Sequence, residues 1–121
     1  MLAHCQAEYP HEGCGLVSGK GKTAKHIYEI DNILNSRTAY EMDPLQQVQT
    51  MLAIEASAED LIAIYHSHPE GPAHPSATDV AQAYYPEAIY LIVSLLNRAE
   101  PGISGFWLDE ASIDEVPLII E

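Results

Sequence analysis

Residues 61–69, in the middle of the chain, read LIAIYHSHP and decide the fold. The first five residues form a short apolar run, which is typical of a strand buried inside a sheet. Side chains alternate between the two faces of a strand, so His66 and His68 point the same way, with Cα atoms roughly 6.6 Å apart. The sequence therefore predicts two imidazole rings converging where a central strand ends. Ser67 points to the opposite face and is predicted to be structural.

A carboxylate, Asp79, follows the two histidines a short distance further along the chain. Residues 69–75 are rich in Pro and Gly, which favours a tight connecting loop, and Asp79 comes eleven residues after His68. Ser76 and Asp79 have the spacing of a helix N-cap and its third residue, which predicts a helix from 77 to about 85. The loop and helix start are expected to bring the Asp79 carboxylate back to the two rings.

These three side chains together predict a zinc site. Two imidazole nitrogens and one carboxylate oxygen are three protein ligands for Zn²⁺, and a fourth position then stays free for water, as catalytic zinc requires. Taken alone, Asp79 is better explained by a capping box with Ser76, and a histidine at a strand end, such as His66, is more often structural than a ligand. The combination of His66, His68 and Asp79 is much rarer than its parts, so we expect one Zn²⁺ per chain.

The rest of the chain predicts a mixed α/β fold with a central sheet flanked by helices. Apolar positions three and four residues apart after Pro44 favour an amphipathic helix. Gly19-Lys20-Gly21 separates two apolar runs and predicts a hairpin. The expected helices cover residues 2–9, 44–58 and 77–85, and the expected strands cover 14–18, 24–30, 61–65, 88–93, 104–109 and 112–120.

Length and composition limit the function. The chain has 121 residues, the size of one domain, and a formal net charge of −13. Residues 1–37 carry no net charge, so the excess lies in residues 38–121. An acidic surface repels phosphate backbones, which argues against nucleic-acid binding. No apolar run is long enough to span a membrane, and no secretory signal is evident, so we expect a cytoplasmic protein with two reduced cysteines, Cys5 and Cys14.

At this point the sequence resembles the JAMM (MPN-plus) family of zinc metalloproteases. The family signature is an upstream Glu, then His-x-His-Pro, ten residues and Asp, and residues 66–69 with Asp79 fit this spacing. Residues 10–19 resemble the Pro-x-Glu-x-Cys-Gly segment of small bacterial members, which places Glu12 as the family glutamate. The resemblance implies a cytidine deaminase-like MPN fold over residues 1–121. This chain begins eleven residues before Glu12, so we expect it to lack the family's first strand.

The resemblance also implies roles for individual residues. Glu12 is the expected proton acceptor for the attacking water and the later proton donor to the leaving nitrogen. Ser76 is expected to donate to the developing oxyanion, to cap the helix, or to do both. A cysteine hydrolase built on Cys14 is the weaker reading, because Cys14 lies in an apolar strand pattern. The other four histidines are expected at the surface, with His74 a possible spare ligand; they are His4, His11, His26 and His74.

Small bacterial members of this family cleave a peptide or isopeptide bond after the C-terminal Gly-Gly of ubiquitin-like sulfur-carrier proteins, and the resemblance implies such a partner here. The chain has no room for the insertions with which eukaryotic members hold ubiquitin, so selectivity for ubiquitin itself is not expected. Two alternatives stay open: a DNA-repair-associated JAMM-like protein, whose pattern Gly71, Pro75 and Ser76 also satisfy, and a non-catalytic MPN scaffold.

Overall fold

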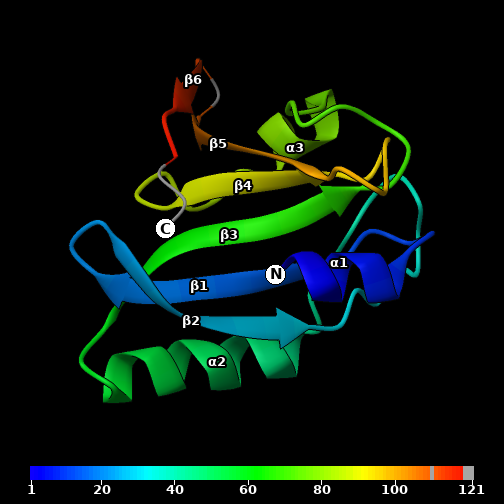
Figure 1. Cartoon of the computed structure of the whole chain (residues 1–121). Helices are drawn as coiled ribbons and strands as arrows, with labels where there is room; N and C mark the ends of the chain where they lie inside the picture. The colour runs from blue at the N-terminus through cyan, green and yellow to red at the C-terminus, as the bar shows by residue number, and fades with distance from the viewer. Residues whose placement is uncertain (110, 119–121) are drawn as a thin grey trace.

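A computed structural model describes residues 1–109 and 111–118 of the chain. Three helices and six strands alternate irregularly along it (Figure 1). The helices are α1 (Leu2–Glu8), α2 (Pro44–Ala56) and α3 (Ala77–Ala81). The strands are β1 (Cys14–Lys20), β2 (Thr23–Ile30), β3 (Asp60–His68), β4 (Ile89–Ser94), β5 (Gly102–Leu108) and β6 (Ile113–Val116). They form a sheet in the order β2-β1-β3-β4-β5-β6, which confirms the predicted mixed α/β fold.

The apolar run at residues 61–65 does form a central strand, β3, with β1 on one side and β4 on the other. β1 and β2 form the predicted antiparallel hairpin, and β1 pairs antiparallel with β3. β3 and β4 are parallel, so the chain must cross over between them, and α3 lies in this crossover. The crossover begins directly after His68, and a connection at this edge of the sheet can bring distant residues back to the strand end.

The helices cover opposite faces of the sheet. On one face, Cys5 of α1 packs with Val17 of β1 and Tyr65 of β3. On the other face, Ile54 of α2 packs with Ile64 and the apolar side chains of four further strands. Because side chains alternate along β3, His66 and His68 share the face of Ile64, on the α2 side.

Helix α2 forms where the sequence predicts an amphipathic helix, and only part of its apolar set is buried. Asp43 caps the helix by accepting a hydrogen bond from Gln46 N at 3.0 Å, and Pro44 occupies the first turn as expected. Ile54 is buried and Met51 is partly buried against the core, whereas Leu45, Val48 and Leu52 are 66%, 56% and 60% exposed. Apolar spacing therefore predicted the helix without showing which of these positions face the sheet.

Several boundaries also differ from the predictions. Helix α3 ends at Ala81 instead of residue 85, since Pro86 disfavours helical geometry at the residue before it and the chain turns after Gln82. Helix α2 ends at Ala56 and not at residue 58, and β3 extends to His68. The last strand covers Ile113–Val116, not 112–120, and the end of the predicted range lies outside the described residues.

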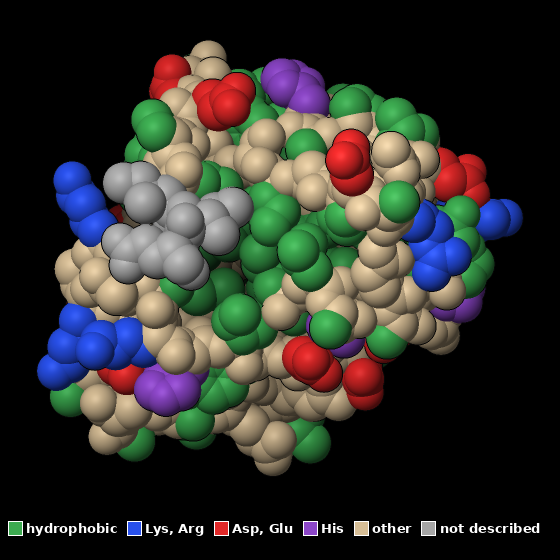
Figure 2. All heavy atoms as spheres, in the orientation of Figure 1, with side chains coloured by type: hydrophobic (Ala, Val, Ile, Leu, Met, Phe, Trp, Pro, Cys, Tyr) green, Lys and Arg blue, Asp and Glu red, His purple; other side chains and the backbone are tan. Residues whose placement is uncertain are grey.

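Basic side chains occupy the two ends of the face shown in Figure 2, and hydrophobic and acidic side chains lie between them. On this face the basic side chains do not form the continuous surface that a nucleic-acid site needs. Within residues 1–109 and 111–118, no helix is long and apolar enough to cross a membrane.

Candidate metal centre

Three side chains meet at the end of β3. His66 Nε2 lies 3.1 Å from His68 Nε2 and 3.1 Å from Asp79 Oδ1, and His68 Nε2 lies 2.9 Å from Asp79 Oδ2. One ligand atom from each residue lies within 4.8 Å of the other two. His66 and Asp79 are almost fully enclosed, and His68 is only slightly exposed. The structure therefore brings together the three residues that the sequence singled out, although Asp79 is distant along the chain.

Contacts behind these side chains fix their orientation. His68 Nδ1 lies 2.9 Å from the Pro72 carbonyl, so Nδ1 carries the proton that it donates and Nε2 is the ring nitrogen that faces the cluster. Ser76 N donates at 2.8 Å to Asp79 Oδ2, the oxygen that also faces His68 Nε2, and so fixes the position of the carboxylate. A hydrogen-bonded partner of this kind sets both the tautomer and the ring plane of a metal-binding histidine.

The electrostatics favour a neutral His66 and an ionised Asp79, the states that bind a cation, whereas in the metal-free site they favour a proton on His68. Burial lowers the pKa of His66, which favours the neutral imidazole. Burial also opposes ionisation of Asp79, but hydrogen bonds from His66 and His68 outweigh it and hold the Asp79 pKa well below its usual range. For His68 the effect of burial is outweighed by Asp79 and the Pro72 carbonyl, and its pKa is raised. Two imidazoles and a carboxylate in this arrangement fit a transition-metal ion such as zinc.

The register between β1 and β3 places Glu12 at the same site. Cys14 pairs with His66 across the two antiparallel strands, and Ser67 N donates to Gly13 O, so Glu12 stands opposite His68. Residues opposite each other in an antiparallel pair share a face, which puts the Glu12 side chain on the side of the two rings. Glu12 is 3% exposed, and its Oε1 has no hydrogen-bond partner among the described residues. Burial raises the pKa of Glu12 to about 8.

Ser76 and Ser67 occupy the positions predicted for them. Ser76 caps α3: its Oγ accepts from Asp79 N at 3.1 Å, completing the capping box. The hydroxyl proton is not used in this bond and is free to donate elsewhere. Ser67 lies on the opposite face of β3, where its buried Oγ accepts from Gly13 N at 2.7 Å. Ser67 therefore ties the strand of the two histidines to the segment that carries Glu12.

The histidines and the cysteine that the sequence analysis set aside lie outside the metal group, but the expectation that His4 is at the surface is wrong. His4 is not a surface residue: it is 8% exposed, and its Nδ1 lies 2.7 Å from the Tyr65 hydroxyl. The burial of His4 was not predicted because nothing in the sequence of this short helix indicates that Tyr65 of a distant strand packs against it. Burial raises the pKa of Cys14 to about 12, which leaves no reactive thiolate. His74 packs edge-on against Phe106 and lies outside the three-residue group.

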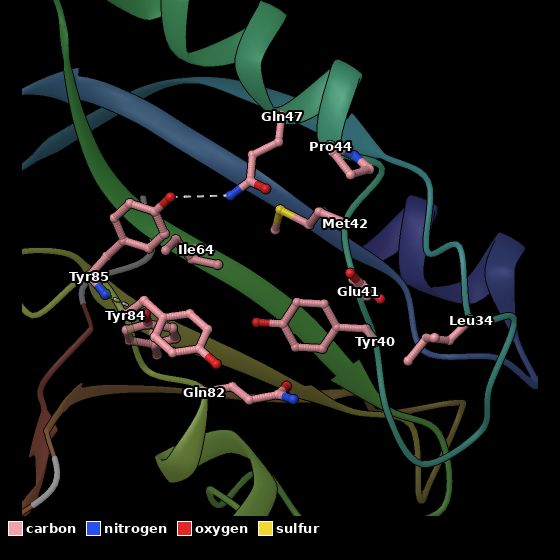
Figure 3. A pocket seen from close by; sticks show the side chains of 11 residues that line it. Leu34, Tyr40, Glu41, Met42, Pro44, Gln47, Ile64, Gln82, Tyr84 and Tyr85 are labelled. Carbon is pink, nitrogen blue, oxygen red and sulfur yellow. Dashed lines mark hydrogen bonds between the residues drawn. The ribbon is translucent and has the colours of Figure 1, made fainter.

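Tyr40 is a site residue that the sequence reasoning missed. Its ring stacks on His66 at 4.7 Å between centroids. Figure 3 shows its hydroxyl pointing into a pocket that Tyr40 helps to line. The pocket has a volume of about 390 Å³ and is lined largely by aromatic and uncharged side chains, among them Ile64, Tyr84 and Tyr90. Tyr40 lies in the irregular segment between β2 and α2, where no periodic pattern identified it.

Comparison with known proteins supports this picture. A family model described as "Prokaryotic homologs of the JAB domain" matches residues 1–109. The CysO-cysteine peptidase of Mycobacterium tuberculosis is 31% identical over 121 residues, covering 98% of this chain and 82% of that protein. A desampylase of Haloferax volcanii is 40% identical over 101 residues, covering 78% of this chain and 73% of that protein.

The fold also matches a solved structure. A solution structure of a protein from Desulfitobacterium hafniense superposes with a TM-score of 0.89 at 31% identity, covering 100% of this chain and 86% of that one. The family match extends over the segment of Glu12 and over all three ligand candidates. The resemblance noted in the sequence is thereby confirmed, and the chain belongs to the prokaryotic branch of the JAB (JAMM/MPN) domain family.

Proposed function

We propose that this protein is a zinc-dependent hydrolase that cleaves a peptide or isopeptide bond after the C-terminal Gly-Gly of a ubiquitin-like sulfur-carrier protein. The observation that carries the proposal is the meeting of His66, His68 and Asp79 at the end of β3, with the buried Glu12 carboxylate on the same face. The names of the two relatives support the substrate class, since both describe enzymes of this kind. A cytoplasmic location belongs to the proposal and agrees with two buried, unbonded thiols.

The residues divide the chemistry among themselves. Zn²⁺, when held by His66, His68 and Asp79, supplies Lewis-acid chemistry that acidifies a water and polarises a carbonyl. Glu12 takes a proton from the water while the water oxygen forms a bond to the carbonyl carbon. Glu12 then gives this proton to the leaving nitrogen as the C–N bond breaks, so a carboxylate and an amine are released. The Pro72 carbonyl keeps His68 in one tautomer throughout.

Ser76 has the smaller role in this proposal. Its hydroxyl donates to the carbonyl oxygen as negative charge develops there, while its Oγ keeps the helix cap. We expect Ser76→Ala to lower kcat by about 10-fold or more, up to the 10²- to 10³-fold seen when one oxyanion donor is removed. The lost cap should cost about 1 kcal/mol of stability.

Ser76→Gly is the matched variant for this test, because Gly at an N-cap costs only a few tenths of a kcal/mol and has no side-chain donor. Thermal unfolding and steady-state rates of both variants separate the two roles. Recovery of stability without recovery of kcat in Ser76→Gly supports the oxyanion role. Recovery of both assigns Ser76 to capping alone.

The substrate tail must approach the metal group closely. The rings of His66 and His68 lie at the end of β3, and one wall of the approach is the Tyr40 ring stacked on His66. Glycines let a backbone come close where a side chain would collide. Affinity should come mainly from the folded body of the carrier, because a short flexible tail loses much conformational entropy when it is ordered.

Replacing the penultimate glycine of a carrier with a bulky residue such as Leu should therefore lower cleavage far more than binding. We expect kcat/KM to fall by about 10²-fold, the cost of displacing a reacting group by about 1 Å. The dissociation constant of the inactive Glu12→Gln enzyme for the carrier should change by less than about threefold, a shift below 1 kcal/mol. Calorimetry and rate measurements on the same carrier pair give both values. Equal cleavage of the two carriers would remove the Gly-Gly assignment and leave the hydrolase chemistry standing.

A further inference from the structure

The backbone of Glu12 is held by a segment that the chemistry above does not use. This segment, residues 32–42, joins β2 to α2 and closes on itself through a bridge between Asn32 and Met42. Glu12 N donates to Ser36 O at 2.7 Å, and Asn32 Nδ2 donates to Glu12 O at 3.0 Å. Both peptide groups beside the Glu12 side chain are thus fixed by this one segment.

Asn32 is the residue on which these contacts converge. Its Nδ2 also donates to Ala39 O at 3.1 Å, and its Oδ1 accepts from Leu34 N and Glu41 N, each at 3.1 Å. The side chain is 8% exposed. All four bonds go to backbone groups, so a single buried amide both shapes the turn and attaches it to Glu12. No other residue type of this size offers two donors and an acceptor in this arrangement.

The same segment also reaches the metal group. Tyr40 follows Ala39, whose carbonyl Asn32 holds, and the Tyr40 ring stacks on His66. Asn32 itself touches none of the three ligand residues through its side-chain bonds. Its contacts therefore link the proton-transferring residue to the wall of the site without taking part in metal binding.

We propose that Asn32 is a positioning residue that holds the Glu12 carboxylate in register with the metal group. The inference rests on the proposed function, and specifically on Glu12 as the acid-base residue. Loss of the amide frees the Glu12 carbonyl and the 32–42 segment together, while Ser67 still anchors Gly13 on the other side. The Glu12 side chain then stays at the site and samples unproductive positions. A displacement of about 1 Å at a reacting group can cost about 10²-fold in rate.

The test compares Asn32→Ala and Asn32→Asp with Ser18→Ala. Asn32→Asp keeps the acceptor for Leu34 N and Glu41 N but loses the donors to Glu12 O and Ala39 O. The variant therefore tests the loss of the bond to Glu12 while two of the bonds that shape the turn remain. Ser18 is fully buried and donates to Glu59 Oε1 at 2.8 Å, toward the other end of β1. Ser18→Ala therefore removes a buried hydrogen bond away from the site and controls for lost stability.

With a Gly-Gly-ending carrier fused to a fluorogenic amine, we expect both Asn32 variants to lower kcat by about 10- to 100-fold with KM changed less than about threefold. Ser18→Ala should keep kcat within about twofold although it also lowers Tm. Zinc content should stay at one per chain in all three variants. In the metal-free protein, amide hydrogen exchange at Glu12 should be faster in both Asn32 variants and unchanged in Ser18→Ala.

A double mutant decides whether Asn32 acts through Glu12. In single-turnover assays, Asn32→Ala should cost less than about twofold when added to Glu12→Gln, because the group that it positions is already gone. An equal loss in both backgrounds, or unchanged Glu12 exchange in Asn32→Ala, would overturn the inference. Wild-type turnover in Glu12→Gln alone would instead overturn the acid-base assignment itself, so the two failures are distinguishable.

Discussion

Glu12→Gln is expected to lower kcat by about 10²- to 10⁴-fold, the range for loss of a positioned acid-base group. The amide keeps the size of the side chain and removes the proton acceptor. The site encloses this group almost completely, and its Oε1 has no protein partner within the described residues, so the amide enters without breaking a hydrogen bond. The fold and the zinc content should therefore stay as they are.

Stability and metal content make this test specific. Glu12→Gln should unfold at the wild-type temperature or above it, because burial already disfavours the charged carboxylate and raises its pKa to about 8. The matched control is Glu8→Gln, which changes a partly exposed acid on α1, 3.6 Å from His4 Nε2, and should leave kcat unchanged. Rates measured with the same carrier substrate compare the two variants. A Glu12→Gln enzyme with wild-type kcat would show that another group moves the proton.

The sequence predicted the metal group well because its geometry is local. Alternation along a strand fixes the shared face of His66 and His68, and the capping spacing fixes Asp79 in the first helical turn. A short loop joins the end of the strand to the start of the helix. This loop belongs to the crossover between the parallel strands β3 and β4, which limits where the helix can lie. Little conformational freedom was left for the three side chains to separate.

Glu12 needed more than local pattern. A single acid in a Gly-rich segment is most simply a solvated loop residue, and the family resemblance reversed that interpretation. In the structure, its place follows from the pairing of Cys14 with His66, which is a contact between segments fifty residues apart. Register between distant strands is set by the whole sheet and not by any short stretch of sequence.

Tyr40 and Asn32 were not predicted, for a related reason. Both lie in the irregular segment between β2 and α2, where side chains show no period of two or of 3.6. Their roles depend on what the segment touches after folding: the Glu12 backbone for Asn32 and the His66 ring for Tyr40.

The other large effect is expected from the ligands. His68→Ala and Asp79→Asn should each abolish stoichiometric zinc binding and lower turnover to background, because two remaining ligands do not make a zinc site. Asp79→Asn also keeps the size of the side chain and one acceptor for Ser76 N, so helix α3 should still be capped. Elemental analysis of protein purified without added metal measures the bound ion.

Asp109→Asn is the matched control for Asp79→Asn. Asp109 Oδ1 also accepts backbone hydrogen bonds, from Ala111 N at 2.7 Å and Ser112 N at 2.8 Å, but no histidine of the described part of the chain bonds to it. Asp109→Asn should therefore keep both zinc and activity. The wild-type protein should gain thermal stability when Zn²⁺ is added after chelation, since an ion that binds the folded chain stabilises it by mass action. The two ligand variants should show no such gain. Zinc at one per chain in His68→Ala would contradict the ligand set, whereas a wild-type protein that binds no metal would favour a non-catalytic MPN scaffold.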